Sequence, residues 1–226
     1  MMTKAGAQQQ VKGFELTEIV KLAEAYRNAP NLSFDLSYTY ADSANPTTIL
    51  EQMSGSTKIS GGKYWSKLDS VEFVQGGRYR LAVYHEDSTV VAADRAAYDD
   101  FLRLPFLDSA FRQANVDSMK VTTVSGPLWR LQIYFNPSSG FSKFVLEYDK
   151  NTYRTTKIEY YVKNSPVDNT GTAIGTAVIT LTVSNYSLLP VDPLIFNEEK
   201  YIYKSNGVLV MKPTYAHFTL VNNTSN

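Results

Sequence analysis

The side chains that could bind a metal or act as a nucleophile are few in this sequence. The only histidines, His85 and His217, stand far apart and have no second histidine at helical or turn spacing. A metal site needs several converging ligands, and a Ser-His-Asp triad needs a histidine with a carboxylate partner. The chain has no cysteine to serve as a thiolate ligand or nucleophile. The sequence therefore predicts no metal, no cofactor and no nucleophilic catalysis.

Carboxylate pairs occur at the adjacent residues Glu86-Asp87, Asp99-Asp100 and Glu198-Glu199. A glycosidase needs two carboxyl groups that face each other across a cleft, roughly 5 to 9 Å apart. Adjacent residues of one turn or helix do not take that arrangement. We interpret the pairs as solvated charge and His85, beside Glu86, as part of a solvated turn. The chain is therefore predicted not to be an enzyme.

The composition indicates a folded, β-rich protein. Of the 226 residues 43% are hydrophobic, and the 16 tyrosines and 11 phenylalanines favour half-buried strands. The 22 basic and 22 acidic residues balance, so no net positive field attracts nucleic acid. A single β domain of this length is common.

The N-terminal residues read as a processing site. Lys4-Ala5-Gly6-Ala7 before Gln8 has the small-x-small pattern that signal peptidase cleaves. We therefore expect residues 1–13 to be a signal-peptide remnant with a disordered N-terminus, and the protein to be a bacterial protein that is periplasmic or otherwise exported. Residues 14–226 are expected to form one β-rich domain, irregular from about residue 190. No apolar run reaches the length of a transmembrane helix.

Hydrophobic periodicity predicts an opening helix and then a sheet. Apolar residues recur at helical spacing from Leu16 through Ile19, Val20 and Ala23 to Tyr26, and Pro30 follows. The charged residues lie off this stripe and are expected to face solvent: Glu15, Glu18, Lys21 and Glu24. From Leu32 to Tyr40 the period changes to two, which is typical of a half-buried strand.

Short strands separated by turn residues follow the first strand. They are expected at 49–60, 63–68, 71–75, 78–85, 88–93, 118–124, 128–135, 141–149, 153–163 and 176–186, with a hairpin at 201–211 and a last strand at 218–221. Gly61-Gly62 and Gly76-Gly77 suit hairpin turns that need a positive φ. Two helices, 95–102 and 107–114, interrupt the series. The order predicts an α+β fold with one long, curled antiparallel sheet.

Large apolar side chains spread over the predicted strands are the remaining candidates for a site. They could line a ligand cavity or fill the core with one another, and both readings stay open. Trp65 and Trp129 are the preferred candidates for ligand contact. The full set is Phe34, Leu36, Tyr38, Trp65, Phe73, Trp129, Leu131, Ile133, Phe144, Leu146 and Tyr148.

Several stretches give the chain a resemblance to the periplasmic outer-membrane lipoprotein-carrier family of LolA, LolB and RseB. They are Leu32-Ser33-Phe34-Asp35-Leu36-Ser37-Tyr38, the run from Ser56 to Trp65, and the runs 144–153 and 157–161. The resemblance covers residues 14–186. It implies an unclosed β-barrel around an apolar cavity, with the mid-chain helix pair as a lid, that takes up acyl chains without a cofactor.

Two functions follow as hypotheses. The first is an exported carrier or sensor that binds lipid or lipoprotein acyl chains, or another apolar ligand. The second is a non-enzymatic envelope adaptor that binds a protein partner through the 153–163 strand or the C-terminal tail. Open sheet edges allow a monomer or a weak dimer.

Overall fold

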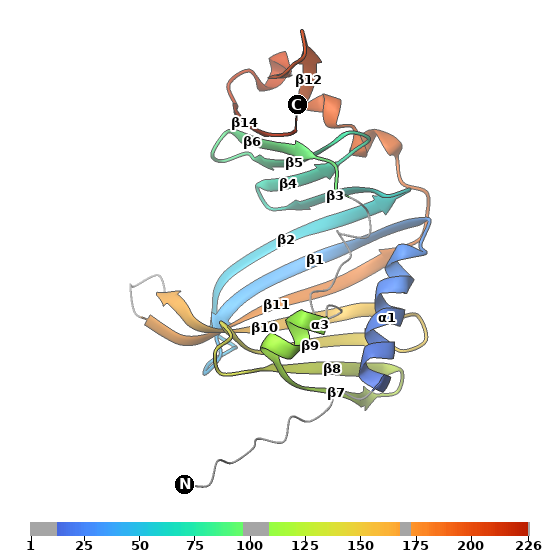
Figure 1. Ribbon diagram of the computed structural model, residues 1–226, viewed down its shortest axis with the longest axis vertical. Helices are drawn as coiled ribbons and strands as arrows, with labels where there is room; N and C mark the ends of the chain where they lie inside the picture. The colour runs from blue at the N-terminus through green and yellow to red at the C-terminus, as the bar shows by residue number, and fades with distance from the viewer. Residues whose placement is uncertain (1–12, 97–108, 168–172, 226) are drawn as a thin grey trace. The chain divides into compact units, whose positions relative to one another are not determined.

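Twelve strands form one sheet in the computed structural model, which describes residues 13–96, 109–167 and 173–225. Their order is β14-β6-β5-β4-β3-β2-β1-β11-β10-β9-β8-β7 (Figure 1). The strands are β1 Asn31–Asp42, β2 Ile49–Ser60, β3 Lys63–Leu68, β4 Val71–Gln75, β5 Tyr79–Tyr84, β6 Thr89–Asp94, β7 Val116–Ser125, β8 Leu128–Phe135, β9 Phe141–Asp149, β10 Arg154–Val167, β11 Ala173–Ser187 and β14 Thr219–Asn223.

The sheet is unclosed, because β14 and β7 stand at its two ends and do not pair with each other. Consecutive strands from β2 to β6 and from β7 to β11 pair antiparallel. Helix α1, Gly13–Arg27, precedes the sheet. The predicted α+β class with a long, unclosed antiparallel sheet and an N-terminal helix is therefore confirmed.

The hairpin turns explain the short strands only in part. Gly61 and Gly62 have φ angles of 55° and 73°, as predicted for a turn that needs the left-handed region. Gly76 and Gly77 do not have positive φ, so their prediction as a positive-φ turn is wrong. Gly76 instead makes room for another side chain, since a Cβ there would lie 1.5 Å from Oε2 of Glu198.

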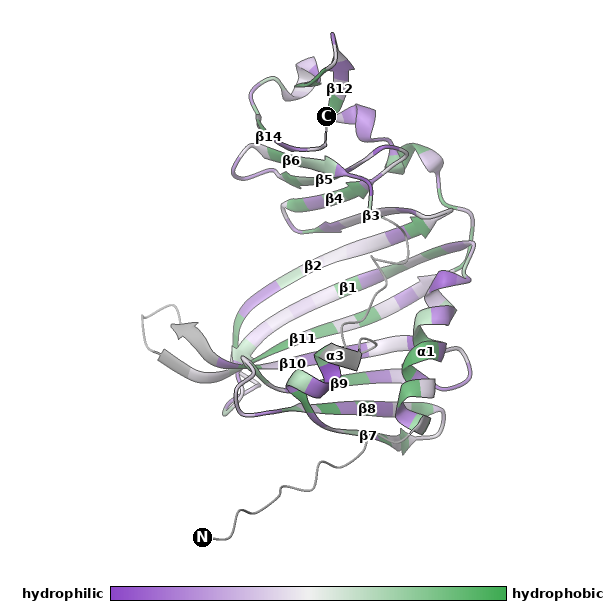
Figure 2. Ribbon diagram, in the orientation of Figure 1, coloured by the Kyte–Doolittle hydropathy of each residue, from purple (hydrophilic) through white to green (hydrophobic). Residues whose placement is uncertain are grey.

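The described residues group into two compact units. Unit 1 draws its described residues from Met1–Arg27, Tyr38–Gln52 and Arg103–Thr182, and unit 2 from Asn28–Ser37, Met53–Leu102 and Val183–Asn226. Apolar and polar residues alternate along β8 and β9 (Figure 2). In unit 1, Ile19 and Leu22 of α1 pack on the apolar side chains of these two strands. Those side chains are Leu131, Ile133, Phe144, Leu146 and Tyr148.

The buried face of α1 differs from the predicted stripe. Val20 is exposed, whereas Leu22 and the carboxylate of Glu18 are buried. The apolar period placed Glu18 on the solvent side, and that placement is wrong. Hydrogen bonds from Tyr148 and Lys150 to Glu18, described below, account for its burial.

In unit 2, the C-terminal segment covers one face of strands β3 to β6. It comprises the 3-10 turns η2 Pro193–Phe196, η3 Glu198–Lys200 and η4 Pro213–Tyr215 and the hairpin of β12 Ile202–Ser205 with β13 Val208–Met211. Tyr201, Ile202 and Leu209 pack there on Val74 and Leu81. The hairpin was predicted. The parallel pairing of β14 with β6 was not.

Some predictions fall outside the described residues. The helix expected at 95–102 lies mostly there, and the helix expected at 107–114 corresponds to α3, Ser109–Asn115. The helix pair as a lid stays a prediction, as do the signal remnant at 1–13 and the domain limits. None of the described helices is long and apolar enough to span a membrane. No cluster of three or more candidate metal ligands occurs among the described residues.

Candidate binding site

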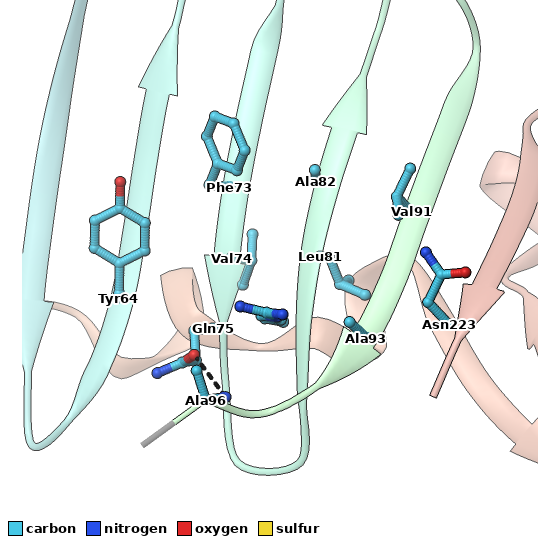
Figure 3. Close-up of a pocket in the computed structure, with 11 residues that line it drawn as sticks. Tyr64, Phe73, Val74, Gln75, Leu81, Ala82, Val91, Ala93, Ala96 and Asn223 are labelled. Carbon is cyan, nitrogen blue, oxygen red and sulfur yellow. Dashed lines mark hydrogen bonds between the residues drawn. The ribbon is translucent and has the colours of Figure 1, made fainter. Parts of the chain in front are cut away.

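An open pocket of about 410 Å³ lies on one face of unit 2 (Figure 3). Figure 3 shows Tyr64 at one end and Asn223 at the other, with Ala82 and Ala93 between them. The pocket is lined by Tyr64, Phe73, Val74, Gln75, Arg80, Leu81, Ala82, Val91, Ala93, Ala96 and Asn223. The small side chains at positions 82, 93 and 96, beside the larger rings of Tyr64 and Phe73, account for the hollow.

Strand register orders the lining into two transverse rows. One row runs across five strands and is mainly polar: Tyr64, Gln75, Arg80, Ala93 and Asn223. The next row, two residues along each strand, is mainly apolar: Ser66, Phe73, Ala82, Val91 and Val221. Residues two apart on a strand share a face, so both rows belong to the pocket side of the sheet.

The polar row is held by a few hydrogen bonds. Gln75 is buried, and its Oε1 accepts from the backbone N–H of Ala96 at 3.2 Å. Burial raises the pKa of the Tyr64 hydroxyl, with a smaller opposing effect of its hydrogen bond with Ser66, so that Tyr64 stays protonated at neutral pH. The row thus offers neutral hydrogen-bonding groups beside the guanidinium of Arg80.

Among the predicted ligand-contact residues, Phe73 lines this pocket and is 40% exposed. Trp65, one of the two preferred candidates, lies on β3 next to Tyr64 and faces the opposite side of the sheet. There it packs against the cluster that the C-terminal segment covers. Its indole N–H donates to Oε1 of Glu72 at 2.6 Å.

The predicted residues of β8 and β9 lie under helix α1. Leu131, Ile133 and Tyr148 are fully buried in the unit 1 core and pack with Ile19 and Leu22. They would contact a ligand only if α1 moved away. Their role in ligand binding stays a prediction.

A buried carboxylate fixes α1 on that surface. Oε2 of Glu18 accepts from the Tyr148 hydroxyl at 2.8 Å and pairs with Nζ of Lys150. The same ammonium lies 4.6 Å from the ring centroid of Trp129, the other preferred candidate. Burial raises the pKa of Glu18, but the bonds from Lys150 and Tyr148 outweigh burial and leave the pKa below its ordinary value.

The three predicted residues of β1 take no part in the pocket. Phe34, Leu36 and Tyr38 are all partly buried, and the ring of Phe34 packs on that of Tyr186 in β11 at 5.3 Å. Sequence reasoning thus placed one residue of its set, Phe73, in the pocket.

Glu72 forms a second buried cluster on the opposite face of β4. Its Oε2 lies 3.2 Å from Nε2 of His85. His85 begins a turn, as the sequence predicts, but its ring also contacts this buried carboxylate, which was not predicted. Burial raises the pKa of Glu72, but hydrogen bonds from Tyr201 and Trp65 outweigh burial and lower it.

The sequence analysis also misjudged the carboxylate of Glu198. It is buried and accepts from the backbone N–H groups of Gly77 and Arg78 at 3.2 and 2.8 Å, so its interpretation as solvated charge is wrong. The carboxylate thereby joins the C-terminal segment to the β4–β5 turn.

Sequence reasoning missed the polar row of the pocket. Tyr64, Gln75 and Arg80 lie on three different strands, and Asn223 comes from β14, where it pairs with Ala93, 130 residues earlier in the sequence. The signal that could have found the first three is their fixed distance from the hairpin turns, which brings them opposite one another. Nothing in the sequence indicated the pairing of β14.

The sequence was also compared with known proteins. No family model and no curated protein matches it. Among solved structures, a DUF1329 family protein from Desulfovibrio piger is 10% identical, with a TM-score of 0.41 over 83% of this chain and 97% of that chain. A LolA superfamily protein from Nitrosomonas europaea is 12% identical, with a TM-score of 0.37 over 81% and 97%. An outer membrane lipoprotein-sorting protein domain from Vibrio parahaemolyticus is 12% identical, with a TM-score of 0.38 over 82% and 97%. The second and third of these structures bear the names of the family that the sequence resembles.

Proposed function

We propose that the protein is an exported, non-enzymatic carrier or sensor that binds an apolar ligand, such as the acyl chain of a lipid or lipoprotein. The observation that carries the proposal is the pocket of about 410 Å³ with the apolar row of Phe73, Ala82 and Val91. Ligand pockets are mostly apolar, with a few polar groups that orient the ligand, and commonly measure about 300 to 1,000 Å³. The pocket has both properties.

Apolar burial predicts how affinity depends on chain length. Each buried methylene contributes about 0.8 kcal/mol, which corresponds to roughly a fourfold gain in affinity. In a series of straight-chain alcohols from six to twelve carbons, affinity should rise with each carbon until the pocket is full. The affinities are measured by isothermal titration calorimetry. Alcohols are used because they carry no charged head group. Equal affinities across the series, or no binding, would contradict the proposal.

Filling the pocket tests where the ligand binds. Ala82 lies between Phe73 and Val91 in the apolar row, so Ala82→Phe should occupy the space and weaken alcohol binding at least about tenfold. Ala44→Phe, the same change in an exposed turn, is the matched control and should bind normally. Unchanged binding by a folded Ala82→Phe variant would place the ligand elsewhere.

Exposed leucines favour a second candidate, an envelope adaptor that binds a protein. Leu188, Leu189 and Leu194, between β11 and β12, are 58%, 74% and 71% exposed. A photocrosslinking residue at position 189 should give one discrete protein adduct in cells if this segment is an interface. The same residue at the exposed position 204 is the control. Adducts of equal pattern at both positions would refute the adaptor function.

A further inference from the structure

We propose that the ligand of this pocket is an anionic amphiphile whose carboxylate or phosphate head group binds Arg80. The inference rests on the proposed function, since it concerns the same pocket. It goes beyond that function in naming the chemical class and the direction in which the ligand lies.

The two rows of the pocket define a head end and a tail end. Gln75 and Arg80 are opposite each other on β4 and β5, and Phe73 and Ala82 are opposite each other two residues further along. Residues two apart on a strand are about 6.7 Å apart. A molecule lying along the strands therefore meets hydrogen-bonding groups at one end and apolar groups at the other.

The apolar end has room for a chain. Phe73 is 40% exposed although it lies on a sheet face that also carries Ala82 and Val91. Exposed aromatic surface beside small residues is what a chain would cover. On the opposite face of the same strands, the C-terminal segment already covers Val83 and Val90.

Arg80 supplies the charge at the polar end. Within the described residues its guanidinium has no carboxylate partner, although the chain carries as many acidic as basic residues. Its neighbour Arg95 donates from Nη2 to the carbonyl of Gly62 at 3.1 Å, which adds a second cation near the Ala96 end of the pocket. Among the residues that the structure describes, no acidic side chain lines the pocket.

The remaining polar groups suit an anion. Asn223 can donate a hydrogen bond from the same row as Arg80. Guanidinium groups bind carboxylate and phosphate with two parallel hydrogen bonds. A neutral ester or alcohol accepts fewer and weaker bonds at this position. The row therefore favours an oxyanion over a neutral head group.

Isothermal titration of three ten-carbon ligands below their critical micelle concentrations tests the inference: decanoate, decyl phosphate and decan-1-ol. At low ionic strength, at least one anion should bind about tenfold more tightly than the alcohol, and salt should reduce the difference. Arg80→Gln should remove this preference, because the affinity for the anions should fall to that for the alcohol. Arg78→Gln, an exposed arginine of the same hairpin outside the pocket, is the matched control and should keep the preference.

The outcomes separate this inference from the proposed function. Preference for decanoate over decyl phosphate would identify a carboxylate ligand, and the reverse preference a phosphate ligand. If the alcohol binds as tightly as both anions, or if Arg80→Gln keeps the preference, the inference is wrong while the apolar pocket stands. If none of the three ligands binds, both the inference and the proposed function are wrong.

Discussion

Replacing Glu18 by glutamine should destabilise unit 1 by about 2 kcal/mol. The carboxylate is 0% exposed and accepts from the Tyr148 hydroxyl at 2.8 Å while it pairs with Lys150. Removing one partner of a fully buried ion pair costs about 3 to 5 kcal/mol. Lys150 is 24% exposed, so water solvates part of the ammonium left behind and lowers the cost. A glutamine also still accepts from Tyr148.

The charge interaction is isolated by a double-mutant cycle with Lys150→Met. The single Lys150 change leaves Glu18 buried with only the Tyr148 bond and a partly exposed Lys21 at 3.5 Å. If the pair is coupled, the cost of the double variant should fall short of the sum of the single costs by about 1 kcal/mol or more. Glu24→Gln, the same change at an exposed position of α1, should alter stability by less than about 0.5 kcal/mol.

The two tryptophans allow each unit to be followed separately during urea unfolding. Trp129 belongs to unit 1 and Trp65 to unit 2. In a Trp65→Phe background, Trp129 fluorescence reports unit 1 alone, and all members of the cycle are compared in that background. The reasoning would be refuted if Glu18→Gln cost no more than Glu24→Gln, or if the cycle were additive. Either result would mean that apolar packing alone holds α1 on the sheet.

Further predictions concern pH and the C-terminal segment. Because the pKa of Glu72 is lowered in the folded protein, this carboxylate is protonated at a higher pH in the unfolded chain than in the folded protein. The stability that it contributes at neutral pH should therefore be lost as the pH falls below the ordinary glutamate pKa. In urea unfolding measured between pH 6 and pH 3, Glu72→Gln should make the free energy of unfolding fall less as the pH falls. An unchanged pH dependence would contradict the lowered pKa of Glu72. Gly76→Ala should lower the melting temperature and disturb the Glu198 contact, because the new Cβ would lie 1.5 Å from Oε2. Gly77→Ala, where that side chain is 3.9 Å away, is its control in thermal unfolding, and equal effects of the two changes would argue against the contact.

Much of the fold could be predicted from alternation and turn residues. Strands β2, β3, β4, β8 and β9 begin and end where the sequence predicts. A period of two defines a strand within its own residues, and a glycine pair or an Asn-Gly defines the adjacent turn. These signals are local, so one sequence suffices to detect them.

The pairings between distant segments could not be predicted in this way. Strand β14 pairs with β6 across 130 residues of sequence, through the register Thr219 with Thr89. The apolar period of α1 likewise failed at Glu18, whose partners lie 130 and 132 residues away. The pocket depends on alanines at 82 and 93 being opposite larger residues on other strands. Such facts become visible only when the register is known.

The two buried glutamates indicate a common physical reason for the position of the covering segments. Glu18 lies on a covering helix and accepts from β9, while Glu72 lies on the sheet and accepts from Tyr201 of the covering C-terminal segment. A buried carboxylate is costly unless its hydrogen bonds are satisfied, whereas apolar contact tolerates small shifts along a surface. Each carboxylate therefore restricts its covering segment to the one position in which the bonds form. The pocket face of β3 to β6 carries no such buried carboxylate among the described residues, and the guanidinium of Arg80 has no carboxylate partner among them.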